Sequence, residues 1–254
     1  AAAAAAAAAA LAVAAVCSSG DAARAFYLPG VAPVEYEQGE KVELKVNKLT
    51  SVKTQLPYKY YDRLPFCMPD KIVDKIENLG EILMGDRIEN SLYDVRSQID
   101  VPCAVLCKTD TISGKELGDL DDLVQNEYRV SWVLDNLPAA MPKILQSVNG
   151  DTTTLYETGF PVGFVGDPQE QPGSQEGVSY LNNHVNIRVL YHNAADADDG
   201  VRIVGFEVEP ESIAHTLDYD DYPSTCLQRD TGPLAVVPPA GSAKSAPDAG
   251  ADKA

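Results

Sequence analysis

Three histidines are the residues of this chain whose type suggests metal-assisted hydrolysis. Zinc held by His184, His192 and His215 would activate a water molecule. His184 and His192 lie eight residues apart in a segment with a strand pattern, which separates them by about 26 Å at roughly 3.3 Å per residue. Ligands of one ion lie much closer, so we prefer exposed or hydrogen-bonded histidines on the polar face of a strand. A metal-dependent hydrolase is the alternative, and metal analysis of purified protein tests it.

An acidic run before Gly200 resembles a calcium loop at first sight, with aspartates at Asp196, Asp198 and Asp199. The run does not fit the EF-hand register, because Ala195 stands five residues before the glycine and no glutamate is correctly placed. A solvated hairpin loop that ends in Asp-Gly explains it fully. The chain also has no phosphate-binding loop, no dinucleotide-binding glycine motif and no G-x-S-x-G elbow. We predict no catalytic residue, no metal ligand and no cofactor.

Four cysteines are the candidate disulfide residues once an N-terminal segment is cleaved. They are Cys67, Cys103, Cys107 and Cys226. An even number in an oxidising compartment predicts two disulfides, with three possible connectivities. Cys103 and Cys107 would lie roughly 13 Å apart on a strand, so they can bond to each other only if the segment turns. A zinc or redox site is disfavoured because there is no C-x-x-C pair.

Four segments alternate apolar and polar residues with the period of two that predicts half-buried strands. Their apolar positions are Val42, Leu44 and Val46; Tyr128, Val130, Trp132 and Leu134; Val185, Ile187, Val189 and Tyr191; and Val204, Phe206 and Val208. One apolar and one polar face is typical of antiparallel sheets. The sequence therefore predicts a mainly β fold, an antiparallel β-sandwich-like domain with one or two short helices.

One helix and two irregular regions complete the expected elements. Ser113 and Glu116 have the spacing of a capping box, which predicts a helix up to about Asn126. Residues 137–180 are rich in Pro, Gly and Gln and predict turns with at most short strands. Residues 231–254 consist mainly of Pro, Ala, Gly, Ser and Asp, so we expect a disordered tail that cannot bury enough apolar surface to fold.

The stretch from Lys48 to Ser91 combines tyrosines, prolines and a cysteine. Its prolines fix extended backbone and remove donors, which predicts that the tyrosine-rich run is not helical. Tyr58, Tyr60 and Tyr61 could line a concave site for a carbohydrate or lipid. We prefer half-buried sheet and turn residues, because tyrosine is a strand-forming residue.

Eight short sequence words occur in a fixed order between Phe26 and Cys226. They are FYLPGVAPVEY, KLTSVKTQLPYKYY, LPFC, ENLGEILMGDRIENS, CAVLC, VLDNLP, NNHVNIRVLYH and VGFEVEPESI. In this order they resemble the nonaspanins, the transmembrane 9 superfamily, and most of all its member-four type. The resemblance implies a lumenal, non-enzymatic domain that precedes nine membrane spans in Golgi and endosomal membranes. It also implies a role in the localisation or sorting of membrane-protein cargo, particularly proteins with glycine-rich spans.

The N-terminal residues 1–25 have the features of a signal peptide that is incomplete at its start. An alanine-rich apolar stretch is followed by an A-x-A site, which predicts cleavage between Ala25 and Phe26. Residues 26–230 are then the lumenal domain of a protein in the secretory pathway. With 38 acidic and 20 basic side chains, its net charge of -18 repels phosphate, so nucleic acids and anionic membrane surfaces are disfavoured as partners.

Two departures from the superfamily concern the end of the sequence. No stretch of 18 or more apolar residues is present, and the superfamily's final strand and membrane region do not follow Cys226. We interpret the chain as a truncated version of a membrane-anchored protein, whose unpaired sheet edge predicts self-association. The alternative is a secreted or lumenal ligand-binding β-sandwich module for a carbohydrate or lipid.

Overall fold

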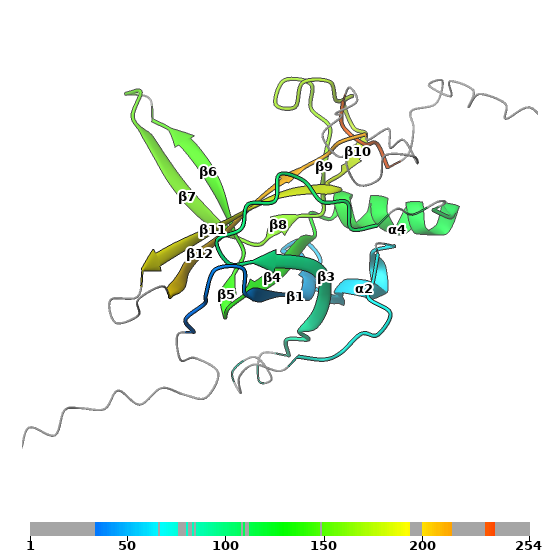
Figure 1. Cartoon of the computed structure of the whole chain (residues 1–254). Coiled ribbons are helices and arrows are strands. Elements are labelled where there is room, and N and C mark those ends of the chain that lie inside the picture. Colours follow the sequence, from blue (N-terminus) through cyan, green and yellow to red (C-terminus); the bar gives the residue numbers. More distant parts are fainter. Residues whose placement is uncertain are drawn as a thin grey trace, which may run out of the picture. The chain divides into compact units, whose positions relative to one another are not determined.

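Strand β1 (Lys41–Thr50) runs through the middle of the larger sheet (Figure 1). Its alternating sequence buries Val42, Leu44 and Val46, each at most 2% exposed, as the period of two predicts. The register against one neighbouring strand shifts between Val46 and Leu49, so that Leu49 is buried as well despite its opposite parity. The predicted strand is confirmed.

Five further strands complete this first sheet. They are β2 (Tyr58–Lys59), β3 (Glu89–Arg96), β4 (Arg129–Leu134), β5 (Leu137–Pro138) and β8 (Phe160–Pro161). The order is β2-β1-β4-β5, with β3 paired to β1 and β8 to β4, and all pairs are antiparallel. Asp135 and Asn136 turn β4 into β5 with φ values of 48° and 62°. Two successive left-handed residues are typical of a tight hairpin that follows the strand twist.

A second sheet has the order β11-β12-β6-β7. Its strands are β6 (Ala140–Gln146), β7 (Thr152–Thr158), β11 (His184–Asn193) and β12 (Val201–Glu211). β6 meets β12 in parallel through the pair Glu207 and Ala140, whereas the other pairs are antiparallel. The chain returns to the first sheet at Gly159, where φ is 68° and a Cβ atom would lie 2.3 Å from the Val130 carbonyl oxygen. Glycine is the residue that both conditions demand.

Two short strands and two helices complete the elements of the described residues. The strands β9 (Gly163–Val165) and β10 (Ser179–Leu181) form a small antiparallel sheet. Helix α4 (Gly114–Gln125) begins with the predicted capping box, in which Ser113 Oγ accepts from the Glu116 amide and Glu116 Oε2 accepts from the Ser113 amide. Helix α2 (Tyr60–Arg63) is a single turn. The mainly β fold class is confirmed.

Helix α2 corrects the prediction that the tyrosine-rich run is not helical. Pro57 and Pro65 lie on either side of the turn and not within it, so no helical hydrogen bond is lost. Tyr60 and Tyr61 are 6% and 9% exposed. Their burial stabilises a turn that local propensity alone would not favour.

The hairpin of β6 and β7 corrects the prediction of turns with at most short strands in residues 137–180. Each of its strands has seven residues. Ile144 is 73% exposed, and Leu145, Leu155 and Tyr156 are 46–56% exposed. Because neither face of the hairpin is buried along its length, its sequence does not need the alternation that marks a half-buried strand. Figure 1 shows this hairpin projecting from the strands that precede and follow it.

A register shift in β12 corrects the apolar face predicted for that strand. The pairing with β11 shifts where Leu190 and Tyr191 face Gly205 and Ile203, which is a β-bulge. As a result Val204 is 58% exposed, while Ile203 is buried in its place. Phe206 and Val208 are buried as predicted.

The structure, a computed structural model, describes residues 34–65, 67–75, 80, 83, 85–107, 109, 112–147, 149–193, 200–214 and 232–236. The predicted cleavage site at Ala25 and Phe26, together with Cys226, His215 and residues 194–199, lies outside them. Within the described residues no helix has both the length and the apolar character needed to cross a bilayer.

Residues 232–236 correct the start of the predicted disordered tail. Ala235 bridges Tyr180, and the Val236 amide donates to the Ser179 carbonyl at 2.8 Å. Leu234 packs against the core, and Val236 is 5% exposed. The two apolar side chains of this short segment give it enough buried surface to pair with β10.

Candidate functional site

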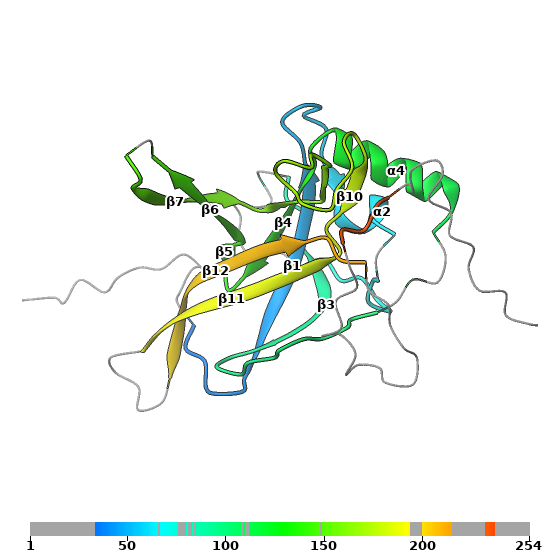
Figure 2. The ribbon, with the colours of Figure 1, turned by 90° about the horizontal axis from the view of Figure 1, so that it is seen from above.

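A cavity of about 840 Å³ is lined by residues of both sheets. One wall comes from β1, β3 and β4, with Val46, Tyr93, Val95, Val130 and Trp132. The other wall comes from β11, with Val185, Ile187, Val189 and Tyr191. Figure 2 shows β11 and β12 crossing over β1 and β3. The alternation predicted for β4 and β11 therefore positions the apolar side chains of both walls.

Aromatic rings pack against one another in the first wall. The ring of Trp132 lies 4.7 Å from those of both Tyr93 and Phe160, and Trp132 is 1% exposed. Its indole N–H makes no hydrogen bond of ordinary geometry with the described residues, although it interacts with the Tyr60 hydroxyl. Burial raises the pKa of Tyr93 far above its usual value, so this hydroxyl stays neutral. The wall is rigid, apolar and uncharged.

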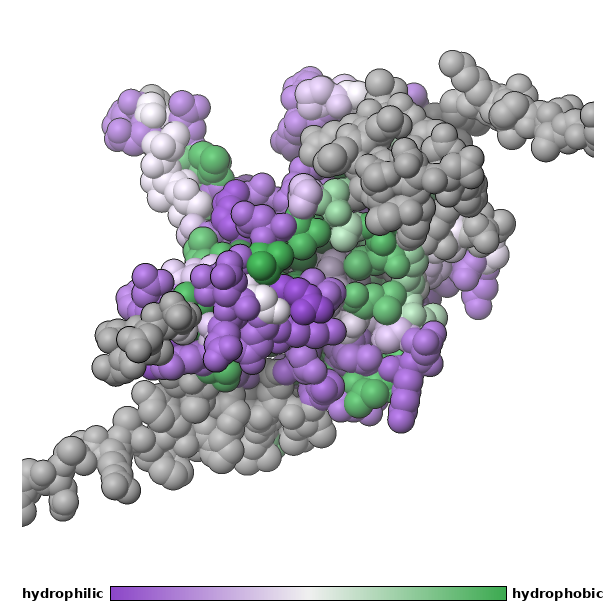
Figure 3. Space-filling model, in the orientation of Figure 1, coloured by the Kyte–Doolittle hydropathy of each residue, from purple (hydrophilic) through white to green (hydrophobic). Residues whose placement is uncertain are grey.

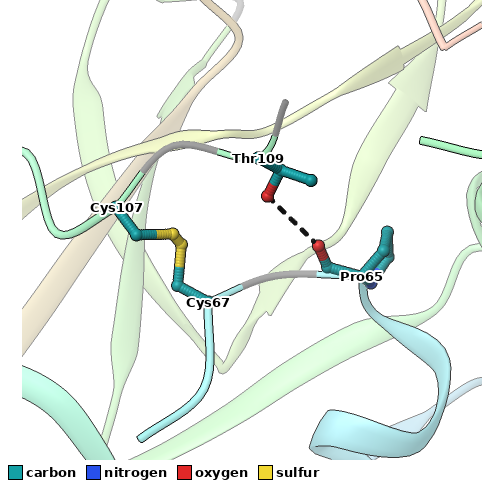
Figure 4. The surroundings of a disulfide bond; sticks show 4 residues. All are labelled: Pro65, Cys67, Cys107 and Thr109. Carbon is teal, nitrogen blue, oxygen red and sulfur yellow. Dashed lines mark hydrogen bonds between the residues drawn. A yellow bond between two sulfur atoms is a disulfide. The ribbon is translucent and has the colours of Figure 1, made fainter. Parts of the chain in front are cut away.

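The strap, which we define as residues 99–107, covers one side of the cavity without regular secondary structure. A disulfide between Cys67 and Cys107, with a Cα–Cα distance of 5.9 Å, ties its end to the segment after α2 (Figure 4). Thr109 Oγ1 also donates to the Pro65 carbonyl at 3.5 Å. The disulfide joins two segments that are 40 residues apart in sequence.

This pairing settles one part of the connectivity that the sequence left open. Cys107 bonds to Cys67, so no bond joins Cys103 to Cys107. Cys103 is disulfide-bonded as well. The prediction for Cys226 falls outside the described residues.

The three tyrosines singled out in the sequence take different positions. Tyr58 is half-buried, its ring 5.3 Å from that of Tyr128 and 4.4 Å from the guanidinium carbon of Arg63. Tyr61 donates to the Asn90 carbonyl at 2.8 Å, and burial raises its pKa to about 12. Tyr60 and Tyr61 pack in the core and also line the cavity. Both residues are thus helical and buried, where half-buried sheet and turn residues were predicted, and a carbohydrate or lipid ligand stays a prediction.

Glu89 is a functional candidate that sequence reasoning missed. It is 4% exposed, and its Oε2 atom has no hydrogen-bond partner among the described residues. Desolvation raises the pKa of this carboxyl, against the opposing charge of Lys59. Nothing in the local sequence distinguishes it from the exposed acidic residues of so acidic a chain.

His184 and His192 are not brought together. His184 and His192 lie near opposite ends of β11, where they face Glu211 and Arg202 of β12. His184 is among the residues that line the cavity, whereas His192 is not. The described residues contain no group of three or more His, Cys, Asp or Glu side chains placed to hold a metal ion. His215 and the aspartates at positions 196, 198 and 199 are outside these residues.

Comparison with known proteins identifies the family. The family model described as endomembrane protein 70 matches residues 57–246. This chain belongs to the endomembrane protein 70 family. The predicted membership in the transmembrane 9 superfamily is confirmed, because the similar curated proteins carry that name. Members of the endomembrane protein 70 family are membrane proteins of the endomembrane system.

Three relatives show the extent of the similarity. Transmembrane 9 superfamily member 8 of Arabidopsis thaliana is 46% identical over 193 residues, which are 76% of this chain and 29% of the relative. Putative phagocytic receptor 1a of Dictyostelium discoideum is 43% identical over 74% of this chain and 28% of its own length. Human transmembrane 9 superfamily member 4 is 38% identical over 82% and 33%. The chain thus spans about a third or less of these relatives. No solved structure matches the chain.

Several sequence words that resemble the family correspond to structural features of the described residues. LPFC contains Cys67, and CAVLC contains both Cys103 and Cys107 of the strap. VLDNLP forms the tight turn from β4 to β5, and NNHVNIRVLYH forms β11. The residues of these words thus form a cavity wall, a turn and a disulfide.

Proposed function

We propose that this chain is the lumenal, non-enzymatic part of a transmembrane 9 protein in Golgi and endosomal membranes. There it helps membrane-protein cargo to reach or stay in the correct membrane. The observation that carries the proposal is the family match over residues 57–246, together with identities of 38–46% to transmembrane 9 proteins. The non-enzymatic part is what the resemblance to the superfamily implies.

We assign the contacts with cargo spans to the membrane region expected from the superfamily. The cargo class is membrane proteins, particularly those with glycine-rich spans, as the resemblance implies. The Dictyostelium relative is named a putative phagocytic receptor, which supports a link between such cargo and adhesion or phagocytosis. The acidic balance of the chain supports a role that involves neither nucleic acid nor an anionic lipid surface.

Self-association through a sheet edge is part of the proposal. β7 (Thr152–Thr158) is the last strand in the order of the second sheet, and its two faces carry the exposed side chains Leu155 and Tyr156, one on each. An edge strand presents unpaired backbone donors and acceptors that a second chain can use. Sedimentation of the full chain should show dimers that Leu155→Lys abolishes, and a monomeric wild type would contradict this part.

The sorting role is tested by a chimera in cells that lack their transmembrane 9 proteins. The chain replaces the matching segment of Arabidopsis member 8, and surface labelling records the location of a membrane protein with a glycine-rich span. We expect the chimera to restore this location. Restoration by the membrane region without this domain would contradict the role of the domain. Digestion of a tag on the domain by protease added to intact vesicles would contradict its lumenal position.

A further inference from the structure

We propose that the cavity between the two sheets is a binding site for one uncharged single-chain lipid of the monoacylglycerol type. This inference goes beyond the proposed function and does not depend on it. It rests on the volume of the cavity, the chemistry of its walls and the pairing of its polar residues.

The volume of the cavity, which opens to solvent, is that of a small-molecule site and not of a packing defect. Protein interiors pack as densely as organic crystals, and few voids exceed the size of a water molecule. An apolar void of about 150 Å³ already takes up benzene. The cavity here measures about 840 Å³, which falls within the range of roughly 300–1,000 Å³ for small-molecule sites.

The walls of the cavity favour an aliphatic ligand. Val185, Ile187 and Val189 project from one side of β11 and are only partly buried, although they pack against the core. Opposite them lie Tyr93 and Trp132. An acyl chain in the cavity would remove from water the part of Val185, Ile187 and Val189 that the protein alone leaves exposed.

The strap adds apolar surface to the same site. Ile99, Val101 and Leu106 are 38–56% exposed, although all three line the cavity. Figure 3 shows hydrophobic side chains gathered on the face where Figure 1 places the strap, surrounded by hydrophilic ones. Contact with an acyl chain would bury these side chains without moving the disulfide that anchors the strap.

The polar residues of the lining favour a neutral ligand over an anionic lipid. Arg96 donates to the Asp94 carboxylate at 3.0 Å, so its charge is already balanced. Asp100 adds a negative charge to the same lining. A fatty-acid carboxylate or a phosphate would therefore meet an unfavourable potential.

Carbohydrate is disfavoured because two amides in the lining already have partners. Asn182 donates to the Pro161 carbonyl, and Asn183 exchanges two hydrogen bonds with the backbone of Ile213. The buried indole N–H of Trp132 lacks a hydrogen bond of ordinary geometry within the described residues.

The single tryptophan of the chain provides the test. The full 254-residue chain, with its disulfides formed, is titrated below the lipid's aggregation concentration with a monoacylglycerol brominated in mid-chain. Bromine quenches indole fluorescence on contact, so we expect saturable quenching of Trp132 at one equivalent. The same lipid without bromine is the control. Equal fluorescence with both lipids would overturn the proposal.

Two matched substitutions locate the bound lipid. Val189→Phe fills the cavity from β11, whereas Val204→Phe makes the same change at a position 58% exposed and outside the lining. We expect Val189→Phe to raise the quenching midpoint at least tenfold and Val204→Phe to change it less than twofold. If Val189→Phe does not fold by circular dichroism, Ile187→Phe takes its place. Equal midpoints, or displacement of the lipid by excess maltotriose, would contradict the proposed site.

Discussion

The region around α4 and the region under the strap are built from similar strands but differ in how they are filled. Next to α4, Leu120, Leu123 and Val124 are at most 3% exposed. A Cβ atom on Gly163 would lie 2.8 Å from the Val124 side chain, which shows how closely helix and sheet approach. Under the strap, Ile187 and Val189 lie on the apolar side of the alternating strand β11, but they face a cavity of about 840 Å³.

The two regions differ in packing because a helix lies over one part of the sheets and the irregular strap lies over the other. A capped helix with an apolar stripe presents regularly spaced side chains that interlock with a sheet. A segment without regular structure presents no such array, and here it is fixed at its end by a disulfide. A period-two pattern therefore predicts which face of a strand is apolar but not whether that face is filled by the protein itself.

The largest expected effect compares one apolar truncation in each region. Leu123→Ala, beside α4, should destabilise the protein by about 2–5 kcal/mol, because it leaves a new cavity in a packed core. Ile187→Ala removes the same number of carbons from a side chain that already faces open space, so we expect less than about 1.5 kcal/mol. Urea denaturation of both variants measures the difference. Equal losses would mean that the two regions are packed alike.

Removal of the strap disulfide should cost nearly as much. The double substitution Cys67→Ser and Cys107→Ser opens a link between residues 40 apart in sequence, which corresponds to roughly 2–4 kcal/mol. Guanidinium denaturation under non-reducing conditions measures the loss. The reduced wild type is the control, and a variant as stable as the oxidised wild type would show that the strap is held by other contacts.

Loss of the cap on α4 should have a smaller effect on the packed region. Ser113→Ala removes the acceptor for the Glu116 amide, which should cost about 1 kcal/mol in thermal unfolding. Ser113→Asp keeps an acceptor at this position and should stay within a few tenths of a kcal/mol of the wild type. The hydrogen bond from Ser113 lowers the pKa of Glu116. The contribution of the ionised Glu116 carboxylate to stability is therefore present above the pKa that Glu116 has in the unfolded chain. It is lost as the pH falls through the lower pKa of the folded protein.

Glu89, in β3 of the first sheet, should make the stability of the protein depend on pH with a sign opposite to that of Glu116. Burial raises the pKa of its carboxyl above the unfolded value. Its stabilising contribution is therefore complete below the unfolded pKa and disappears as the pH rises through the folded pKa. Glu89→Gln should raise the melting temperature at pH 7 and change it little at pH 4. A variant less stable than the wild type at pH 7 would show that the charged form is needed.

The sequence predicted the parts of the fold whose burial follows a regular period. The alternation in β1, β4 and β11 and the capping box of α4 depend on local spacing, and each led to the correct element. The exposed β6–β7 hairpin was missed because it has no buried face along its length. The position of Val204 was wrong because one bulge in β12 reverses the side to which the next residue points.

The candidate site was predictable only in its parts. The tyrosine-rich run and the apolar face of β11 were identified from the sequence, and both line the cavity. Their proximity depends on the crossing of two sheets and on a disulfide between distant cysteines, which four cysteines alone cannot specify. The burial of Glu89, whose Oε2 atom has no hydrogen-bond partner among the described residues, likewise depends on tertiary structure and has no local pattern.

The most direct test asks whether the region under the strap holds a lipid. The full chain is purified from a secretory expression host without detergent, its lipids are extracted, and mass spectrometry identifies and quantifies them. We predict close to one neutral single-chain lipid per wild-type chain and per Val204→Phe chain, and a loss of at least tenfold for Val189→Phe. The lipid site would be contradicted if all three samples were free of lipid and if added monoacylglycerol left the melting temperature of the protein unchanged.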